Sequence, residues 1–238
     1  MNLHQLAGGP FVWVAFAVFF IGLVVQTVRF FKMTSKNDAA TPVLPAKPKA
    51  PEKIQERLGY EWDKLVKRYR RSVFHLHPLM SVATLIFHVL LFLVPIFLLA
   101  HNELFRISLG FGLPSFPDWL SDALAIIVLS VLGIFLFRRL FIKRVRIISG
   151  VYDYLILIIT AAPFITGVMA YHKVFDYNKV LTAHMLMGEL MLVLIPFTRL
   201  GHALFFVLYR VLIPGEYSFR KGSRRWNTGA GKVVARSR

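Results

Sequence analysis

Five apolar segments, separated by polar stretches, dominate the hydropathy pattern of the chain. They cover residues 11–31, 79–100, 119–137, 151–170 and 181–209. Each is close to or longer than the ~20 residues that an α-helix needs to cross the core of a bilayer. The pattern therefore predicts an all-α integral membrane protein, a bundle of five transmembrane helices. No basic residue precedes the first segment and no small-residue cleavage site follows it, so we expect a helix that is retained.

The stretch between the first two apolar segments has a different character. Residues 32–78 are polar and carry prolines at 42, 45, 48 and 51, which favours an extended linker. Residues 54–71 repeat apolar positions with a helical period, which predicts an amphipathic helix near the membrane surface. The expected organisation is a first transmembrane helix (1–31), a cytoplasmic linker region (32–78), a four-helix transmembrane core (79–212) and a basic cytoplasmic tail (213–238).

Lysine and arginine are distributed unevenly between the two ends of the apolar segments. One side carries 24 of them, in residues 32–78, 138–148 and 210–238, and the other side carries only 3. Basic loops remain on the cytoplasmic side, so the N-terminus is expected outside and the C-terminus in the cytoplasm. The net charge of +17 is explained by this placement, and we expect no binding to nucleic acid.

Composition limits the chemistry of any bound cofactor. The chain is 56% hydrophobic and has no cysteine. This excludes disulfides, thiolate-ligated iron–sulfur clusters, covalently attached c-type haem and cysteine zinc sites within the chain. A redox centre held by this chain must use histidine, methionine or carboxylate ligands.

Histidine is the residue type that points to such a centre, because ionisable groups inside a membrane are costly and usually functional. His184 and His202 lie 18 residues apart in the last apolar segment. On a continuous helix this spacing returns to the same face, with about 27 Å between the two levels. Two b-type haems, each with two axial imidazoles, would use such a pair. His4 is close to the N-terminus and is set aside.

The second apolar segment must supply the other two ligands. His77 and His88 are 11 residues apart and face nearly the same way, whereas His88 and His101 are 13 apart and face opposite ways. The directions of these side chains favour His77 and His202 as the ligands of the inner haem. They favour His88 and His184 as the ligands of the outer haem. The rise from His77 to His88 is only about 16.5 Å, so His101 as outer ligand and His75 as inner ligand remain open.

Three sequence motifs carry a resemblance to a known family. AHMLMGELMLVLIPFTRLGH (183–202), FRRLFIKRVRIISGVYDYLIL (137–157) and FHVLLFLVP (87–95) resemble the membrane (gamma) subunit of respiratory nitrate reductase. The resemblance implies a five-helix dihaem cytochrome b of the prokaryotic cytoplasmic (inner) membrane that exchanges electrons with the quinone pool. It also implies His88 and His184 as partners, with His77 the nearest candidate partner for His202.

Other segments resemble a branch of related proteins more closely. The long insertion 32–78, AYHKVFDY (170–177) and LLAHNELF (98–105) are similar to dihaem membrane subunits of transmembrane redox complexes of sulfate reducers. That similarity implies a cytoplasmic iron–sulfur partner resembling heterodisulfide reductase. It also implies further membrane subunits or a periplasmic multihaem cytochrome c as partners. The chain would be the quinone-reactive electron-transfer subunit of an oxidoreductase complex.

Further residues suit the expected cofactors. Arg138, Arg139 and Arg199 are candidates to pair with haem propionates. A menaquinone or menaquinol site near the outer haem would draw on His101, His172, Asp118 and Glu189. For His101, His172 and His77 an interfacial position at a helix end is the competing interpretation. The alternative function is a non-haem membrane anchor or a small histidine-containing ion or proton transporter.

Overall fold

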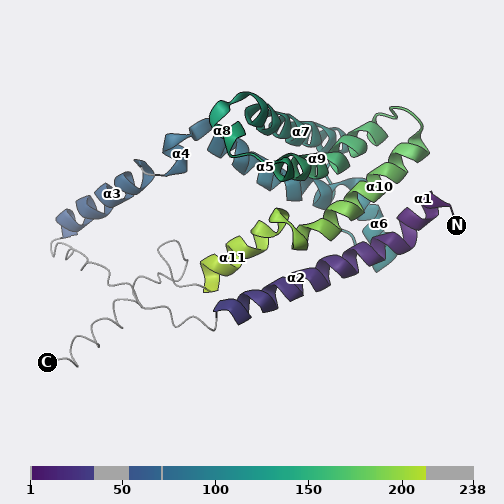
Figure 1. Ribbon diagram of the computed structural model, residues 1–238, viewed down its shortest axis with the longest axis horizontal. Coiled ribbons are helices and arrows are strands. Elements are labelled where there is room, and N and C mark those ends of the chain that lie inside the picture. Colours follow the sequence, from purple (N-terminus) through teal and green to yellow (C-terminus); the bar gives the residue numbers. More distant parts are fainter. Residues whose placement is uncertain (1, 35–53, 71, 213–238) are drawn as a thin grey trace. The chain divides into compact units, whose positions relative to one another are not determined.

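The computed structural model describes residues 2–34, 54–70 and 72–212, and the regular elements in these residues are all helices, without strands (Figure 1). The proline-rich part of the linker and the basic tail lie outside the described residues. The chain divides into two units, one of residues 1–10 and 50–191 and the other of residues 11–49 and 192–238.

Five of the described helices are long and apolar enough to cross a membrane, as the hydropathy pattern predicts. They are Leu3–Met33, Pro78–Phe97, Asp118–Phe141, Val151–Tyr171 and Tyr177–Phe197. Even in Asp118–Phe141, the best covered, only 28% of the most apolar 18-residue window is buried in the protein. Apolar side chains that a soluble protein would bury are left to contact lipid, so the chain is a multi-pass membrane protein.

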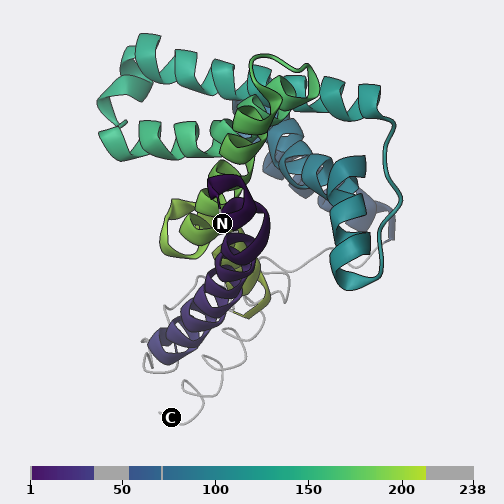
Figure 2. The same ribbon diagram turned by 90° about the vertical axis from the view of Figure 1, so that its right-hand side faces the viewer.

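In the first unit, α7 (Asp118–Phe141) packs against both α5 (Pro78–Phe97) and α9 (Val151–Tyr171). Figures 1 and 2 both show α7 and α9 side by side. Val128 is completely buried at the centre of this contact, among apolar side chains of α5, α7 and α9. In a bilayer such tight packing, rather than exclusion of water, holds helices together.

Shorter helices complete the first unit. They are α1 (Leu3–Leu6), α3 (Ile54–Arg70), α4 (Val73–Leu76), α6 (Leu99–Leu109) and α8 (Lys143–Ile147). The last span begins in this unit as α10 (Tyr177–Leu194), whose final residues, from Leu192, belong to the second unit. A π-helical turn (η1, Ala7–Phe11) with Pro10 inside it follows α1. The amphipathic helix predicted in the linker forms as α3, and its apolar side chains Leu58, Trp62, Leu65 and Tyr69 are exposed.

The second unit contains α2 (Val12–Thr34) and the end of the last span, where the structure departs from the expected single long helix. After α10 ends at Leu194, the backbone forms two 3₁₀ turns, η2 (Ile195–Phe197) and η3 (Arg199–Gly201), and then α11 (His202–Leu212). Thr198 between the turns is extended, with φ −122° and ψ −178°. Pro196 contributes to the break because it has no N–H to continue an α-helix.

The packing of α7 is open to a direct test with Val128→Leu. An extra methylene at a fully buried position costs about 1–3 kcal/mol, so the unfolding midpoint of the purified protein in detergent should fall. Ile127→Leu is the matched control, because Ile127 is the next residue on the same helix and is 41% exposed. Equal midpoints for the two variants would contradict the assignment of Val128 to the packed interface.

Candidate functional site

Four histidines each make the same type of hydrogen bond, which determines which ring nitrogen carries the proton. In each, Nδ1–H donates to a backbone carbonyl, because a carbonyl can only accept. The pairs are His88 with Thr84 (2.7 Å), His101 with Pro95 (2.9 Å), His184 with Pro163 (2.9 Å) and His202 with Arg199 (2.7 Å). With the proton held at Nδ1, the lone pair of the neutral ring is on Nε2. This is the usual preparation of a metal-ligating histidine.

Two of these histidines lie beside each other in the first unit. The ring centroids of His101, on α6, and His184, on α10, are 6.0 Å apart, and the ring planes differ by 25°. A metal ion bound to one nitrogen of each ring at about 2 Å would separate opposed centroids by about 6 Å. The centroid spacing is therefore compatible with one metal ion held between the two rings.

The position of His101 follows from a break in the backbone. The helix α5 ends at Phe97, Leu98 is extended (φ −69°, ψ 129°), and α6 begins at Leu99. The carbonyl of Pro95, one turn before the break, accepts the Nδ1–H of His101. An extended residue after a membrane span thus places the imidazole against the end of α5.

Asn102 holds this break together, and nothing in the sequence pattern identified it. Its buried side chain (4% exposed) donates to the carbonyls of Ile96 (2.9 Å) and Leu98 (3.2 Å) and accepts from the N–H of Leu113 (3.0 Å). Asn102 therefore ties both sides of the break to the loop that leads to α7. The only available signal was its position next to His101, where a buried amide suits backbone groups without helical partners.

The position of His184 depends on α9. Besides the carbonyl of Pro163, the hydroxyl of Thr166 lies 3.3 Å from Nδ1. The imidazole also lies against Gly167, where an added Cβ would be 3.1 Å from Cε1 of His184. A side chain at position 167 would therefore force the ring to shift by a few tenths of an ångström.

His4, which the sequence gave no reason to choose, contacts the same region of α10. Its Nδ1 is 2.8 Å from Oγ1 of Thr182, and Thr182 donates its own proton to the carbonyl of Asn178. Gly8 lies against Met185: a Cβ added to Gly8 would be 3.6 Å from the sulfur of Met185. The N-terminal residues therefore cover α10 on both sides of His184 in the sequence.

Of the pair His101 and His184, His101 lies outside the membrane spans, and burial changes its pKa. Burial lowers the pKa of His101 below its ordinary value, and the hydrogen bond to Pro95 opposes this shift. His101 is therefore neutral near pH 7, and a neutral imidazole is the form that binds a metal.

The prediction that His184 and His202 share one face of one helix is wrong. Two 3₁₀ turns separate α10 from α11, so counting 100° per residue does not apply between them. The two residues also belong to different units. His202 is the first residue of α11 and is exposed.

The remaining histidine candidates lie where the second span begins. His77 is exposed at the junction of α4 and α5, with φ −140° and ψ 64°, and Pro78 opens α5 behind it. His75 is exposed too, and its ring centroid is 5.4 Å from that of Tyr69. The structure brings His184 together with His101, the open alternative, while the pairing of His88 with His184 and of His77 with His202 stays a prediction.

The three candidate arginines have different surroundings. Arg139 donates to Oγ of Ser149 (3.0 Å), and its carbonyl accepts from the hydroxyl of Tyr154 (3.1 Å), so it stabilises the turn between α7 and α9. Arg138 is half-buried at the end of α7. Arg199 is exposed in η3 and next to the break.

The residues expected to take up or release protons at a quinone site lie in three different places. Asp118 is exposed at the start of α7. Nε2 of His172, after α9, is 3.0 and 3.1 Å from the carboxylate oxygens of Asp122, a partner that the sequence did not reveal. Oε1 of Glu189 in α10 is buried and has no hydrogen-bond partner among the described residues. An unsatisfied carboxyl oxygen in a membrane span is a functional candidate.

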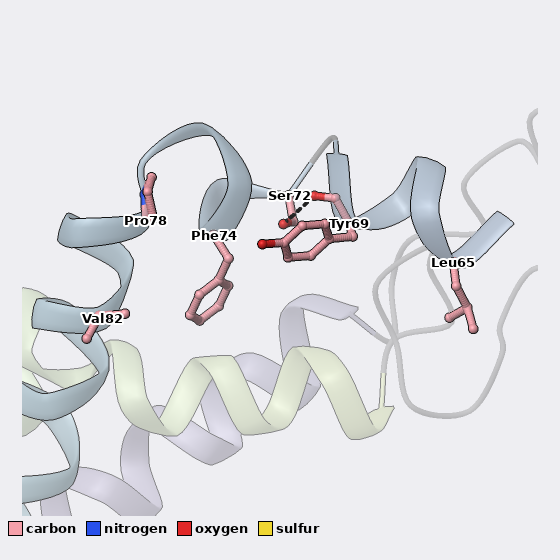
Figure 3. Close-up of a pocket in the computed structure, with 6 residues that line it drawn as sticks. All are labelled: Leu65, Tyr69, Ser72, Phe74, Pro78 and Val82. Carbon is pink, nitrogen blue, oxygen red and sulfur yellow. Dashed lines mark hydrogen bonds between the residues drawn. The ribbon is translucent and has the colours of Figure 1, made fainter. Parts of the chain in front are cut away.

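A separate apolar groove lies where α3 and α4 meet the start of α5 (Figure 3). Its volume is about 560 Å³, and its lining consists of Leu65, Tyr69, Ser72, Phe74, Pro78 and Val82. None of the predicted ligands lines it, although His75 lies against Tyr69. The groove is therefore distinct from the histidine pair.

In the described part of the chain, no group of three or more histidine, aspartate and glutamate side chains is placed to chelate a bare metal ion. A pair of imidazoles suits instead a cofactor that brings its own equatorial ligands to the metal. The fold and these residues define the class: an all-helical, multi-pass membrane protein with paired histidines.

Comparison with known proteins adds the family. A protein of Nitratidesulfovibrio vulgaris, described simply as "Protein", is 32% identical over 228 residues, which cover 92% of this chain and 96% of the relative. The chain belongs to the same family as this protein. No family model and no solved structure matches the chain.

The role of Asn102 leads to a stability prediction. Asn102→Leu leaves the N–H of Leu113 without its partner and removes two bonds across the break, at a cost of about 2–4 kcal/mol. We expect a lower unfolding midpoint in detergent and faster proteolysis between α6 and α7. Glu103→Gln is the control: it disrupts only the exposed ion pair with Arg106, worth less than about 1 kcal/mol. An unchanged midpoint for Asn102→Leu would contradict this role.

Proposed function

We propose that this protein is a dihaem b-type cytochrome, the membrane subunit of a redox complex in the prokaryotic cytoplasmic membrane. It exchanges electrons between the menaquinone pool and a cytoplasmic iron–sulfur partner. The observation that carries the proposal is the pair His101 and His184, with ring centroids 6.0 Å apart and Nδ1 of each ring bound by a backbone carbonyl.

This pair supports an outer haem with ligands that differ in one residue from the sequence prediction. His184 keeps its role, and His101 replaces His88 as its partner. Both hydrogen bonds orient the ring and leave Nε2 for the iron, which is how protein groups select the ligating nitrogen. The lack of cysteine agrees with a haem held without covalent attachment.

His88 and His202 are two further residues that we assign as haem ligands. They carry the same Nδ1 bond to a carbonyl as the outer pair, and no such bond is present at His75 or His77 among the described residues. This assignment rests on the shared tautomer and on their places in the sequence. His77, at an exposed helix junction, is better explained as part of the start of α5.

Haem supplies one-electron transfer, and the residues of the chain supply its surroundings. Arg138, Arg139 and Arg199 are the arginines that we assign to the propionates, because a guanidinium can bind a carboxylate through two hydrogen bonds. Glu189 and the pair His172–Asp122 are groups able to take up protons when a menaquinol is oxidised. The basic segments on the cytoplasmic side would attract an acidic surface of the iron–sulfur partner.

A transporter of protons or ions is the second candidate, and the unpaired oxygen of Glu189 is the observation that favours it. Such a protein would purify without a Soret band. A reduced-minus-oxidised spectrum of the purified chain therefore separates the two functions in one measurement.

The ligand set predicts haem contents for single variants. We expect about two haems per chain in the wild type and about one in His101→Ala, in His184→Ala and in the double variant, because both residues hold the same iron. His77→Gln should keep both haems. The measurement is a pyridine haemochrome assay per mole of purified protein. Loss of different haems in His101→Ala and His184→Ala would refute their pairing.

The predicted orientation has its own test, made simple because the chain has no cysteine. Lys179→Cys, at the start of α10, should react with a membrane-impermeant maleimide added to intact cells with a permeabilised outer membrane. Lys143→Cys, at the start of α8, should react only after the cytoplasmic membrane is opened. Both lysines are exposed, so the pair is matched, and the reverse labelling pattern would invert the topology.

A further inference from the structure

The break in the last span leaves backbone carbonyls that need hydrogen-bond donors from elsewhere in the second unit. Residues 195–201 leave the α-helical pattern, so several carbonyls there lose the N–H groups of a regular helix. Inside a bilayer there is no water to replace them, and each unsatisfied group costs several kcal/mol. Other parts of the chain must therefore supply donors.

The first helix of this unit supplies one of them. Gln26, in the middle of α2, donates from Nε2 to the carbonyl of Pro196 at 2.8 Å. An amide side chain within an otherwise apolar span is expensive unless it has such a partner. This hydrogen bond gives the glutamine amide group a partner and satisfies one carbonyl of the break.

A close approach of the two backbones makes this bond possible. A Cβ added to Gly22, one turn before Gln26, would be 2.6 Å from Cγ and 2.8 Å from Cβ of Pro196. No side chain fits there without moving the proline ring. Gly22 is buried, and it admits the ring directly against α2.

After the break in the sequence, aromatic side chains extend the contact between α2 and the last span. Phe30 of α2 is buried, and its ring is 5.1 Å from that of Tyr209 in an edge-to-face arrangement and 6.3 Å from that of Phe205. Such aromatic pairs add about 0.5–1.5 kcal/mol beyond the area they bury. The helix α2 therefore contacts the span on both sides of His202.

The break in turn determines the direction of His202. Thr198 accepts the N–H of Leu200 and starts η3, and a Cβ on Gly201 would be 3.0 Å from the carbonyl of Ile195. The carbonyl of Arg199, inside η3, accepts the Nδ1–H of His202 at 2.7 Å. The imidazole is thus oriented by η3, the second 3₁₀ turn of the break.

We propose that α2 is the positioning element for the haem held by His202, and that Gln26 and Gly22 are its positioning residues, acting through Pro196 and the two 3₁₀ turns. This inference rests on the proposed function. It assigns a role to the first span, which contains none of the histidines assigned to haem.

The test uses Gln26→Leu in the full-length protein and Thr27→Val as the matched control. Thr27 is the next residue on α2, and its hydroxyl bonds only to the carbonyl of Leu23 in its own helix. Each change is also made in the His184→Ala background, where the remaining haem is the one that His202 holds. The readouts are haem content, the low-spin ferric electron paramagnetic resonance signal and a redox titration of each haem.

We expect Gln26→Leu to shift the signal and midpoint potential of the His202 haem, or to lower haem content from about two to about one per chain. The haem of His101 and His184 should be unchanged, and Thr27→Val should resemble the wild type. Gly22→Leu should reproduce the effect of Gln26→Leu. Gly22→Ala should give a smaller effect, because its single Cβ displaces the ring of Pro196 and presses on that of Phe197 without adding a longer side chain.

Two haems with unchanged signals in both Gln26→Leu and Gly22→Leu would overturn the inference while leaving the proposed function intact. Simultaneous loss of both haems in Gln26→Leu would also overturn it, because the effect would not be specific to His202. A wild-type protein without haem would refute the proposed function itself.

Discussion

The hydrogen bonding of backbone carbonyls in a medium without water is the constraint on which this structure depends. A regular helix satisfies its own carbonyls, and the chain departs from that state after Phe97 and after Leu194. At each departure a side chain amide takes over: Asn102 at the first and Gln26 at the second. A histidine then donates Nδ1–H to a carbonyl next to the break. Breaks in the helices thus produce ordered imidazoles.

Much of the architecture follows from the sequence because long apolar segments have few alternatives to membrane-spanning helices. The five spans and the amphipathic helix α3 were predictable in this way. The importance of histidine was predictable too, since polar residues in such segments are costly. Pro95 and Pro196 marked the neighbourhoods of the breaks without revealing their form.

The sequence left the contact between His101 and His184 only as an alternative, because angular counting assumes a continuous helix. His88 and His101 point to opposite sides of an ideal helix, yet Leu98 interrupts it, and His101 reaches the ring of His184. The same assumption failed between His184 and His202. Asn102, Gly167 and Asp122 escaped notice for a related reason: their roles arise from contacts between segments, which no local pattern records.

The bond between His4 and Thr182 joins residues 178 positions apart in the sequence. During synthesis, residues 2–10 leave the ribosome before α10, which emerges only after three intervening spans. The contact around His184 is therefore completed only when the fifth span has been made. A truncated chain presents His101 without His184, and only a chain inserted through its fifth span brings the two rings together.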